Sequence, residues 1–242
     1  MRIITFLMTF LRTLFTYLLG AIGVIILLSP VIILLLLPKQ LRPYKIIFYL
    51  LYLFYKLCVY ALLMPIEITG NPDLIKLPSI IVSNHQSSLD IAILGMLCKG
   101  KKHLWLVLER YKDKFILGFF IRKLFITVNQ ESEIQAARSL IKAIKTIIND
   151  PQYLIIFPEG GRFTDGKVHQ FFEGFAIIAK KTGYPVIPIY MENNYRIYPP
   201  YTFLIYYNKI KVKIAEPIYM NPQETNDQFS KRIHNWFEKQ TK

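Results

Sequence analysis

With 242 residues, the chain has room for one domain of ordinary size and an accessory segment, and 53% of its residues are hydrophobic. Lys and Arg outnumber Asp and Glu by 30 to 16, and the resulting charge of +14 favours a negatively charged partner, either nucleic acid or a membrane surface. The two cysteines, Cys58 and Cys98, exclude a disulfide framework and lack the spacing of metal ligands, so we expect them to be core residues.

The first 64 residues are strongly apolar and predict attachment to a membrane rather than binding of nucleic acid. Residues 13–37 include no charged side chain, and about 20 apolar residues are enough to cross a bilayer as a helix. Pro30 would kink or break this helix, so two shorter membrane-buried helices are an alternative to one span. A second apolar segment, 46–64, contains Lys56 near its centre. That lysine favours a helix in the membrane interface, or packed on the rest of the protein, over a second span.

Beyond residue 64, short β-branched runs alternate with helical patterns. The runs predicted as strands lie near 67–69 and at 79–82, 104–108, 125–128, 153–157, 185–190, 203–207 and 210–214. The clearest predicted helix spans 132–148, where apolar residues recur at steps of three and four, namely Ile134, Ala137, Ile141, Ile144 and Ile148. The polar segment 223–242 predicts a closing surface helix. This alternation favours an α/β fold with a mostly parallel central sheet flanked by helices. We therefore expect an apolar helical pair at 1–64 and an α/β domain at 65–242.

The stretch SNHQSSLD (83–90) follows one predicted strand, and it has two interpretations. If His85 lies in the turn and Asp90 in the first helical turn, the carboxylate can hold one ring nitrogen of His85, and the other nitrogen is free to take a proton from a hydroxyl. Alternatively, Ser87 and Asp90 have the spacing of a capping box, which would make them purely structural.

The stretch FPEGGR (157–162) follows another predicted strand and is a second candidate site. Gly160 and Gly161 allow the backbone to approach a ligand closely, and Arg162 offers a planar fork for a phosphate. The alternative is a glycine turn with a solvated arginine. Because ligands of α/β sheets bind beyond the carboxyl ends of strands, two polar stretches at two such ends support each other as parts of one site.

Four stretches together resemble the glycerolipid acyltransferase family, which includes the lysophosphatidic acid acyltransferases. NHQSSLD (84–90) resembles the family's N-H-x-x-x-x-D signature, and FPEGGR resembles its F-P-E-G-T-R block, with Gly161 where threonine is usual. YPVIPIY (184–190) resembles the block that follows about 25 residues later, and the segment around Gly118 resembles the second block. The resemblance covers roughly residues 65–215, and an apolar N-terminal pair of helices is also usual in the family.

The resemblance implies a role for each matching residue. His85 would be the general base on the acceptor hydroxyl, and Asp90 would orient it. The hydroxyl would then attack the thioester of acyl-CoA or of an acyl carrier protein, with no covalent acyl-enzyme, metal or other cofactor. The acceptor's glycerol phosphate would be held by Glu159, Gly160, Gly161 and Arg162. Pro188 would lie in the fourth block, near the acyl path.

One departure from the family concerns the acceptor. The second block usually ends in an aspartate-arginine pair whose arginine binds the acceptor phosphate, but here the matching residues are Asn129 and Gln130. Arg122 and Lys123 lie upstream and are candidates to compensate. A lysophospholipid other than 1-acylglycerol-3-phosphate, or another lipid alcohol, is therefore an alternative acceptor.

The remaining basic and imidazole groups give weaker signals. CKGKKH (98–103) is a basic cluster that we expect beside the site, where it would meet the phosphates of coenzyme A, an acidic carrier protein or anionic lipids, unless it is a solvated loop. Arg110, Lys112 and Lys114 are expected to extend it. The other histidines, at 103, 169 and 234, lack metal-like spacing and are predicted at the surface.

The sequence thus predicts a membrane-associated O-acyltransferase whose active site opens at the bilayer interface, with membrane lipids and the acyl donor as partners and no nucleic acid. Two other classes compete with this prediction. A lipid hydrolase would use the same base to activate water, but the chain has no G-x-S-x-G nucleophile elbow. A non-catalytic membrane or nucleic-acid binder fits the charge but does not explain the two site motifs.

Overall fold

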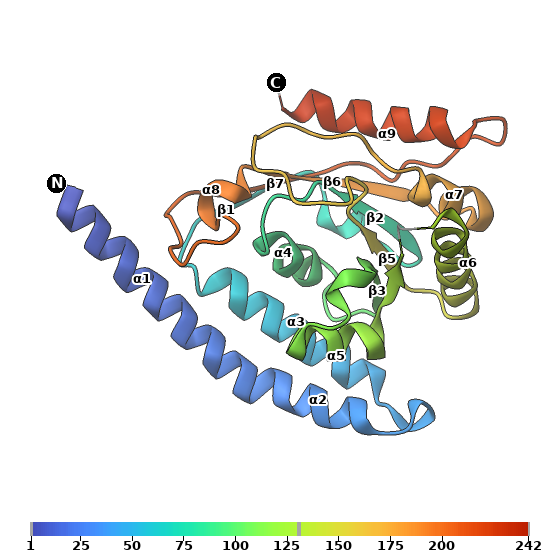
Figure 1. Cartoon of the computed structure of the whole chain (residues 1–242). Helices are drawn as coiled ribbons and strands as arrows, with labels where there is room; N and C mark the ends of the chain where they lie inside the picture. Colours follow the sequence, from blue (N-terminus) through green and yellow to red (C-terminus); the bar gives the residue numbers. More distant parts are fainter. Residues whose placement is uncertain (1, 130–131, 242) are drawn as a thin grey trace.

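The chain folds around a seven-stranded sheet (Figure 1) in a computed structural model, which describes residues 2–129 and 132–241. The strands are β1 (Ile66–Thr69), β2 (Ser79–Ser83), β3 (His103–Leu108), β4 (Ile126–Val128), β5 (Tyr153–Ile156), β6 (Val186–Glu192) and β7 (Ile210–Ile214). Their order is β1-β7-β6-β2-β5-β3-β4, and the neighbouring strands are parallel except for β6 and β7. The predicted α/β fold with a mostly parallel sheet is confirmed.

Helices cover both faces of the sheet, and successive residues of β2 point to opposite faces. Ile80 and Val82 belong to one apolar core, and Ile81 belongs to the other. All five residues of β2 are buried, as a strand covered on both sides requires, which explains its unbroken apolar run. The helices of this part are α3 (Tyr44–Tyr60), α4 (Leu89–Leu97), α5 (Phe115–Leu124), α6 (Glu133–Asn149), α7 (Gly174–Thr182), α8 (Asn194–Ile197) and α9 (Asn226–Gln240).

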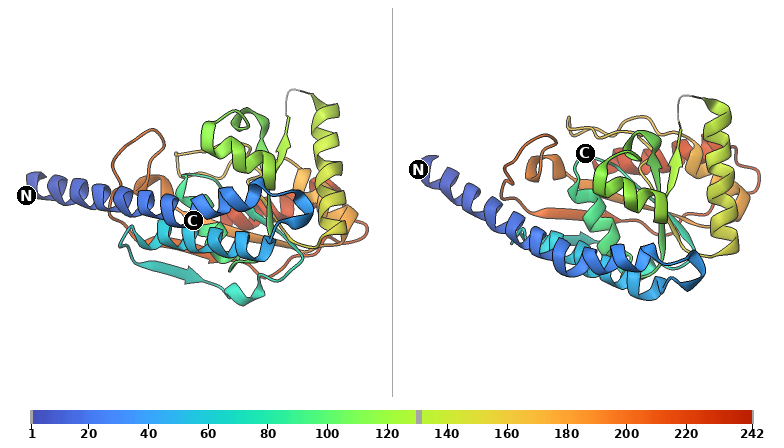
Figure 2. Two further views of the ribbon diagram at one scale, coloured as in Figure 1. Left: turned by 90° about the horizontal axis from the view of Figure 1, so that it is seen from below. Right: turned by 60° about the horizontal axis from the view of Figure 1, so that its bottom comes forward.

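The first apolar segment forms a continuous rod along one side of the molecule (Figure 2). It consists of α1 (Arg2–Gly23), a π-helical turn at Val24–Leu28 and α2 (Ser29–Leu36). Pro30 does not break it, because the wider π turn just before the proline makes room for a ring that would otherwise clash with the carbonyl four residues back. The helix from Ile3 to Leu36 is, by length and composition, able to cross a membrane, and only 22% of its most apolar window is buried.

The second apolar segment, α3, packs on α4 and contributes to the same core as the sheet. Ile47, Phe48 and Leu51 are almost completely buried. Lys56 is exposed, and its ammonium lies 5.9 Å and 5.8 Å from the ring centroids of Tyr52 and Tyr60. Of the two placements expected for this helix, the structure has the one packed on the rest of the protein.

The predicted strand at 203–207 is wrong, because this segment is irregular. Its backbone bonds to α1 instead of to a sheet: the Ile205 N–H donates to Thr13 Oγ1 (3.0 Å), and Arg12 donates to the Ile205 carbonyl (2.9 Å). An apolar aromatic run that packs on a helix has the same sequence pattern as a buried strand, so periodicity alone does not separate the two.

The helices predicted at 132–148 and 223–242 are confirmed as α6 and α9. A capping box between Thr225 and Gln228 begins α9. In α6 four of the five residues that revealed the helix are exposed, and only Ile144 among them packs against the core. Ile134, Ile141 and Ile148 are 66%, 52% and 50% exposed, whereas the inner face carries Ala143 and Ile147.

Of the minor expectations, the placement of the cysteines is confirmed and that of His103 is wrong. Cys98 is buried and Cys58 packs against the same core. His103 is 1% exposed, because it begins β3 beneath α3, and its ring centroid lies 4.9 Å from that of Phe48. Burial lowers the pKa of His103 to about 4. The other two histidines, His169 and His234, are half-buried.

Candidate active site

Three strand ends meet at one edge of the sheet, and the candidate residues follow them. Strands β5 and β6 both pair with β2 in parallel, so all three end at the same edge. Residues 84–88 follow β2, residues 157–162 follow β5, and residues 193–194 follow β6. The two stretches that the sequence singled out are therefore neighbours, at the edge where α/β folds bind ligands.

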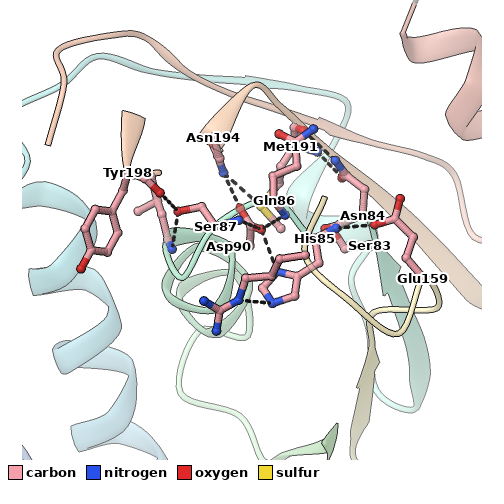
Figure 3. A network of polar contacts seen from close by, with 12 residues as sticks. Ser83, Asn84, His85, Gln86, Ser87, Asp90, Glu159, Met191, Asn194 and Tyr198 are labelled. Carbon is pink, nitrogen blue, oxygen red and sulfur yellow. Dashed lines mark hydrogen bonds and ion pairs between the residues drawn. The ribbon is translucent and has the colours of Figure 1, made fainter. Parts of the chain in front are cut away.

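His85 and Asp90 are in direct contact (Figure 3). Nδ1 of His85 lies 2.9 Å from Oδ2 of Asp90, and the same oxygen accepts the backbone N–H groups of Gln86 (2.6 Å) and Ser87 (2.8 Å). Asp90 is fully buried, so these donors replace the water that its carboxylate loses. A carboxylate beside Nδ1 assigns the imidazole proton to that nitrogen and leaves the lone pair on Nε2.

The capping interpretation of the same stretch is compatible with this contact. The Asp90 carboxylate accepts the Ser87 N–H, which is one half of a capping box. The other half differs, because Ser87 Oγ accepts the Leu89 N–H (3.2 Å) and donates to the Tyr198 carbonyl (2.7 Å). The contacts that begin α4 are thus the contacts that hold Asp90 against His85.

Asn194, which the sequence analysis missed, holds the second oxygen of Asp90. Its Nδ2 donates to Oδ1 (2.8 Å), and the residue is fully buried (Figure 3). Nearby, Asn84 exchanges two hydrogen bonds with the backbone of Met191, at 2.9 Å and 2.8 Å, which fixes the loop after β2 to β6. The signal in the sequence is the polar run 192–194, which ends an otherwise apolar strand and continues beyond it.

Glu159 lies behind His85 and contacts backbone rather than the cavity described below. One carboxylate oxygen accepts the His85 N–H and the other accepts the His169 N–H, both at 3.0 Å. The side chain is only 5% exposed. Burial raises the pKa of Glu159 to about 7, although the two N–H donors act in the opposite direction.

The loop after β5 supplies the remaining contacts of the His85 ring. Phe157 stacks on it with centroids 3.9 Å apart and planes 11° apart. Arg162 Nε donates to His85 Nε2 at 3.2 Å. Gly160 has φ +66°, a left-handed conformation that favours glycine. At Gly161 an added Cβ would meet the Phe163 ring at 3.4 Å, so the threonine usual in this block would find ordinary contacts.

A cavity of about 510 Å³ opens beside His85, within the size range of small-molecule sites. His85, Gly160, Gly161 and Arg162 border it, and most of the wall is apolar. Elements from distant parts of the sequence contribute to that wall: Leu28 from the π turn, Leu51 and Tyr55 from α3, Trp105 from β3, and Leu117 and Phe120 from α5. The N-terminal helices are therefore part of the cavity itself.

The basic cluster 98–103 is not beside the site, contrary to expectation. Helix α4 runs away from His85, so residues 98–103 lie where β3 begins, at the opposite edge of the sheet. Lys99 pairs with Asp73 and Lys102 pairs with Asp150 there. Arg110 lies beyond the other end of β3 and lines the cavity.

The residues that match the family's acceptor arginine are only partly described. Asn129 follows β4, and Gln130 lies outside the described residues. Arg122, a candidate to compensate, donates to the Lys112 carbonyl at 2.6 Å. Pro188 lies inside β6 opposite Val82 and is not among the described residues that line the cavity.

Comparison with known proteins adds three findings. A family model described as Acyltransferase matches residues 65–192, just over half of the chain. The 1-acyl-sn-glycerol-3-phosphate acyltransferase of Limnanthes alba is 28% identical over 180 residues, which are 71% of this chain and 61% of that protein. The enzyme of the same name from Saccharomyces cerevisiae is 26% identical over 176 residues, 68% of this chain and 55% of its own length.

The fold has a close counterpart among solved structures. The crystal structure of the 1-acyl-sn-glycerophosphate (LPA) acyltransferase PlsC from Thermotoga maritima superposes with a TM-score of 0.77 over 97% of this chain and 96% of that one, at 23% identity. The chain spans about 61% of the length of the Limnanthes relative. The match to more than half of the chain, together with the four sequence blocks, shows that the protein belongs to the acyltransferase family, as the resemblance to glycerolipid acyltransferases predicted.

Proposed function

We propose that the protein is a membrane-associated O-acyltransferase that moves an acyl group from an acyl thioester to the free hydroxyl of 1-acylglycerol-3-phosphate. The observation that carries the proposal is the His85–Asp90 pair at the wall of a largely apolar cavity. A base that faces both an apolar chain and an alcohol is what this transfer needs. The names of the relatives from Limnanthes alba and Saccharomyces cerevisiae support the choice of acceptor.

In the proposed reaction, His85 Nε2 takes the proton of the acceptor hydroxyl while the oxygen attacks the thioester carbonyl. A C–O bond forms, the tetrahedral intermediate collapses, and the C–S bond breaks. The leaving thiolate of coenzyme A or of an acyl carrier protein receives the proton from His85. Asp90 stabilises the imidazolium that exists between the two proton transfers. The steps require no acyl-enzyme, metal or cofactor.

Arg162 is proposed to bind the acceptor phosphate and, in doing so, to give up its contact with Nε2 of His85, so that this nitrogen is free to act as the base. Its Nε lies 3.2 Å from His85 Nε2, the atom that must meet the hydroxyl, so this contact has to break before transfer. A phosphate offers the guanidinium a bidentate, charged partner that an imidazole does not. An acceptor with a phosphate would therefore move Arg162 away from His85 and place its own hydroxyl there.

Arg110 is proposed to supply the positive charge that residues 129–130 lack. It lines the same cavity as Arg162 and His85, and its guanidinium lies 5.3 Å from the Tyr111 ring centroid. The cavity thus has two arginines, on the loops after β3 and β5, available to one phosphate.

Membrane attachment is proposed through the rod of α1, the π turn and α2. Much of its outer surface is apolar and exposed; Ile25 and Ile26, for example, are 69% and 61% exposed. On the inner side of the same π turn, Leu28 belongs to the cavity wall. In the proposed arrangement the site lies at the membrane interface, and an acyl chain passes between the bilayer and the cavity without crossing water. The partners are then membrane lipids and the acyl donor, and no nucleic acid is involved.

The first prediction tests the base. Replacing His85 by alanine should lower kcat for transfer from labelled acyl-CoA to lysophosphatidic acid by about 10²- to 10⁴-fold, because the proton acceptor is lost. Asn194→Ala should lower kcat less, since Asp90 keeps three donors on its other oxygen. Circular dichroism and gel filtration in detergent check that the variants fold.

Two outcomes would contradict this assignment. Full transfer by the folded His85→Ala protein would exclude His85 as the base. Rapid release of free fatty acid by the wild-type protein, dependent on His85 and unchanged by added lysolipid, would show a hydrolase instead of a transferase.

The second prediction tests the acceptor. Arg110→Gln should raise KM for lysophosphatidic acid about 10-fold or more, because a hydrogen bond to a charged group is lost, while rates with monoacylglycerol change little. Lys101→Gln is the control, since it removes the same charge at the opposite edge of the sheet. A wild-type enzyme with no preference for the phosphate would exclude this acceptor. An unchanged KM in Arg110→Gln, with the preference intact, would exclude only Arg110.

The third prediction concerns Glu159, which we infer to position His85 through its backbone. Its pKa of about 7 exceeds the ordinary value of 4.5. Between pH 4.5 and about pH 7, the folded chain therefore retains a proton that the unfolded chain has released. The resulting stability is fully present below pH 4.5 and is lost as the pH rises to about 7.

Relative to Glu159→Gln, the free energy of unfolding of the wild type should therefore fall by about 3 kcal/mol between pH 4.5 and pH 8. Urea unfolding in detergent, followed by tryptophan fluorescence at several pH values, measures this difference. A constant difference between the two proteins across the range would mean that Glu159 ionises as an exposed carboxyl does.

A further inference from the structure

Helix α6 exposes an apolar stripe that the described part of the chain leaves uncovered. Ile134, Ala137, Ile141 and Ile148 lie on one side of the helix and are all exposed, three of the four being large side chains. In α9, on the opposite side of the molecule from the rod (Figure 1), the arrangement is the ordinary one: Phe229, Ile233 and Phe237 are buried and the exposed positions are polar. The stripe on α6 is therefore not what packing on the sheet requires.

A row of cations runs beside the stripe. Arg138, Lys142 and Lys145 are exposed on α6. They border a groove of about 410 Å³, and Lys39 from the turn after α2 borders it too. None of the ion pairs between described residues includes any of these four side chains. Asp150 also borders the groove, but it pairs with Lys102. The groove thus combines unpaired positive charge with an apolar edge.

This surface is continuous with the proposed membrane-facing side of the rod. Lys39 follows the end of α2, where Ile33 and Leu36 are both 65% exposed and Leu41, just beyond, is 67% exposed. Seen from below, the rod and α6 both lie uncovered on the viewer's side of the molecule (Figure 2). The apolar surface of the rod therefore continues, across the basic groove, to the stripe on α6.

We propose that α6 is a second membrane-contact element, which lies in the headgroup region of an anionic lipid surface; the inference rests on the membrane attachment proposed above. A helix with isoleucines on one side and lysines beside them matches the chemistry of that region, because the apolar side chains enter the acyl boundary and the cations meet lipid phosphates. A second copy of the chain fits less well, since a symmetric contact through this face would bring two sets of four cations together.

The contact would have a consequence for the active site. Leu140 of α6 lines the cavity, one residue before Ile141 in the exposed stripe. Lipid contact at α6 would therefore hold the part of the cavity wall that includes Leu140 near the bilayer. The rod would do the same for the part that includes Leu28. The rod and α6 would together fix how the cavity faces the lipid that supplies its substrates.

The test places a fluorescent label at single positions of the full chain. In a background with Cys58→Ala and Cys98→Ala that retains transfer activity, nitrobenzoxadiazole is attached to Ile141→Cys on the stripe, to Gln135→Cys on the polar side of the same helix, or to Ile33→Cys on the rod. Each protein is mixed with phosphatidylcholine–phosphatidylglycerol vesicles whose acyl chains carry bromine, a short-range quencher.

Quenching at position 141 should be comparable with that at 33 and several-fold larger than at 135. High salt, or vesicles without phosphatidylglycerol, should reduce it at 141 more than at 33, because cations hold α6 to the surface. If 141 behaves like 135 while 33 is quenched, the inference about α6 is wrong and membrane attachment stands. Protection of 141 from aqueous iodide without quenching by bromolipid would show a protein partner instead. If no position is quenched, the proposed attachment itself fails.

Discussion

The buried carboxylate of Asp90 is the charge around which the site is arranged. It accepts hydrogen bonds from the His85 ring, from two backbone N–H groups of the loop after β2, and from Asn194 after β6. A buried charge without such partners is strongly destabilising, so the loop, the start of α4 and the end of β6 are held in one arrangement. The position and tautomer of His85 follow from it.

Sheet topology makes this arrangement possible. Because β2 lies between β5 and β6, residues 74 and 107 positions apart in the chain meet at one edge, through Glu159 with His85 and through Met191 with Asn84. The N-terminal rod adds a second constraint, since Leu28 and residues of α3 form part of the cavity wall. In the proposed enzyme, the part that binds lipid and the part that transfers the acyl group therefore share a wall.

Much of the fold and of the site was predictable from the sequence, because short local patterns indicate where strands, helices and polar strand ends lie. The β-branched runs identified seven strands, and the polar stretches after β2 and β5 identified two sides of the site. The predictions that were wrong concern features that depend on contacts between distant segments. The run 203–207 bonds to α1 rather than to a strand, His103 is covered by α3, and the apolar period of α6 does not say which side faces the core. Asn194 was missed for the same reason, since its partner Asp90 is 104 residues away.

The tautomer of His85 shows most directly whether Asp90 sets this residue up as the base. ¹⁵N NMR of the full chain in detergent, with labelled histidine and the His85→Ala spectrum to assign the signal among four histidines, distinguishes the two ring nitrogens. We predict a neutral ring with the proton on Nδ1 and a free lone pair on Nε2, and loss of that preference in Asp90→Asn. A proton on Nε2 in the wild-type protein would contradict it, because that nitrogen could not then act as the base.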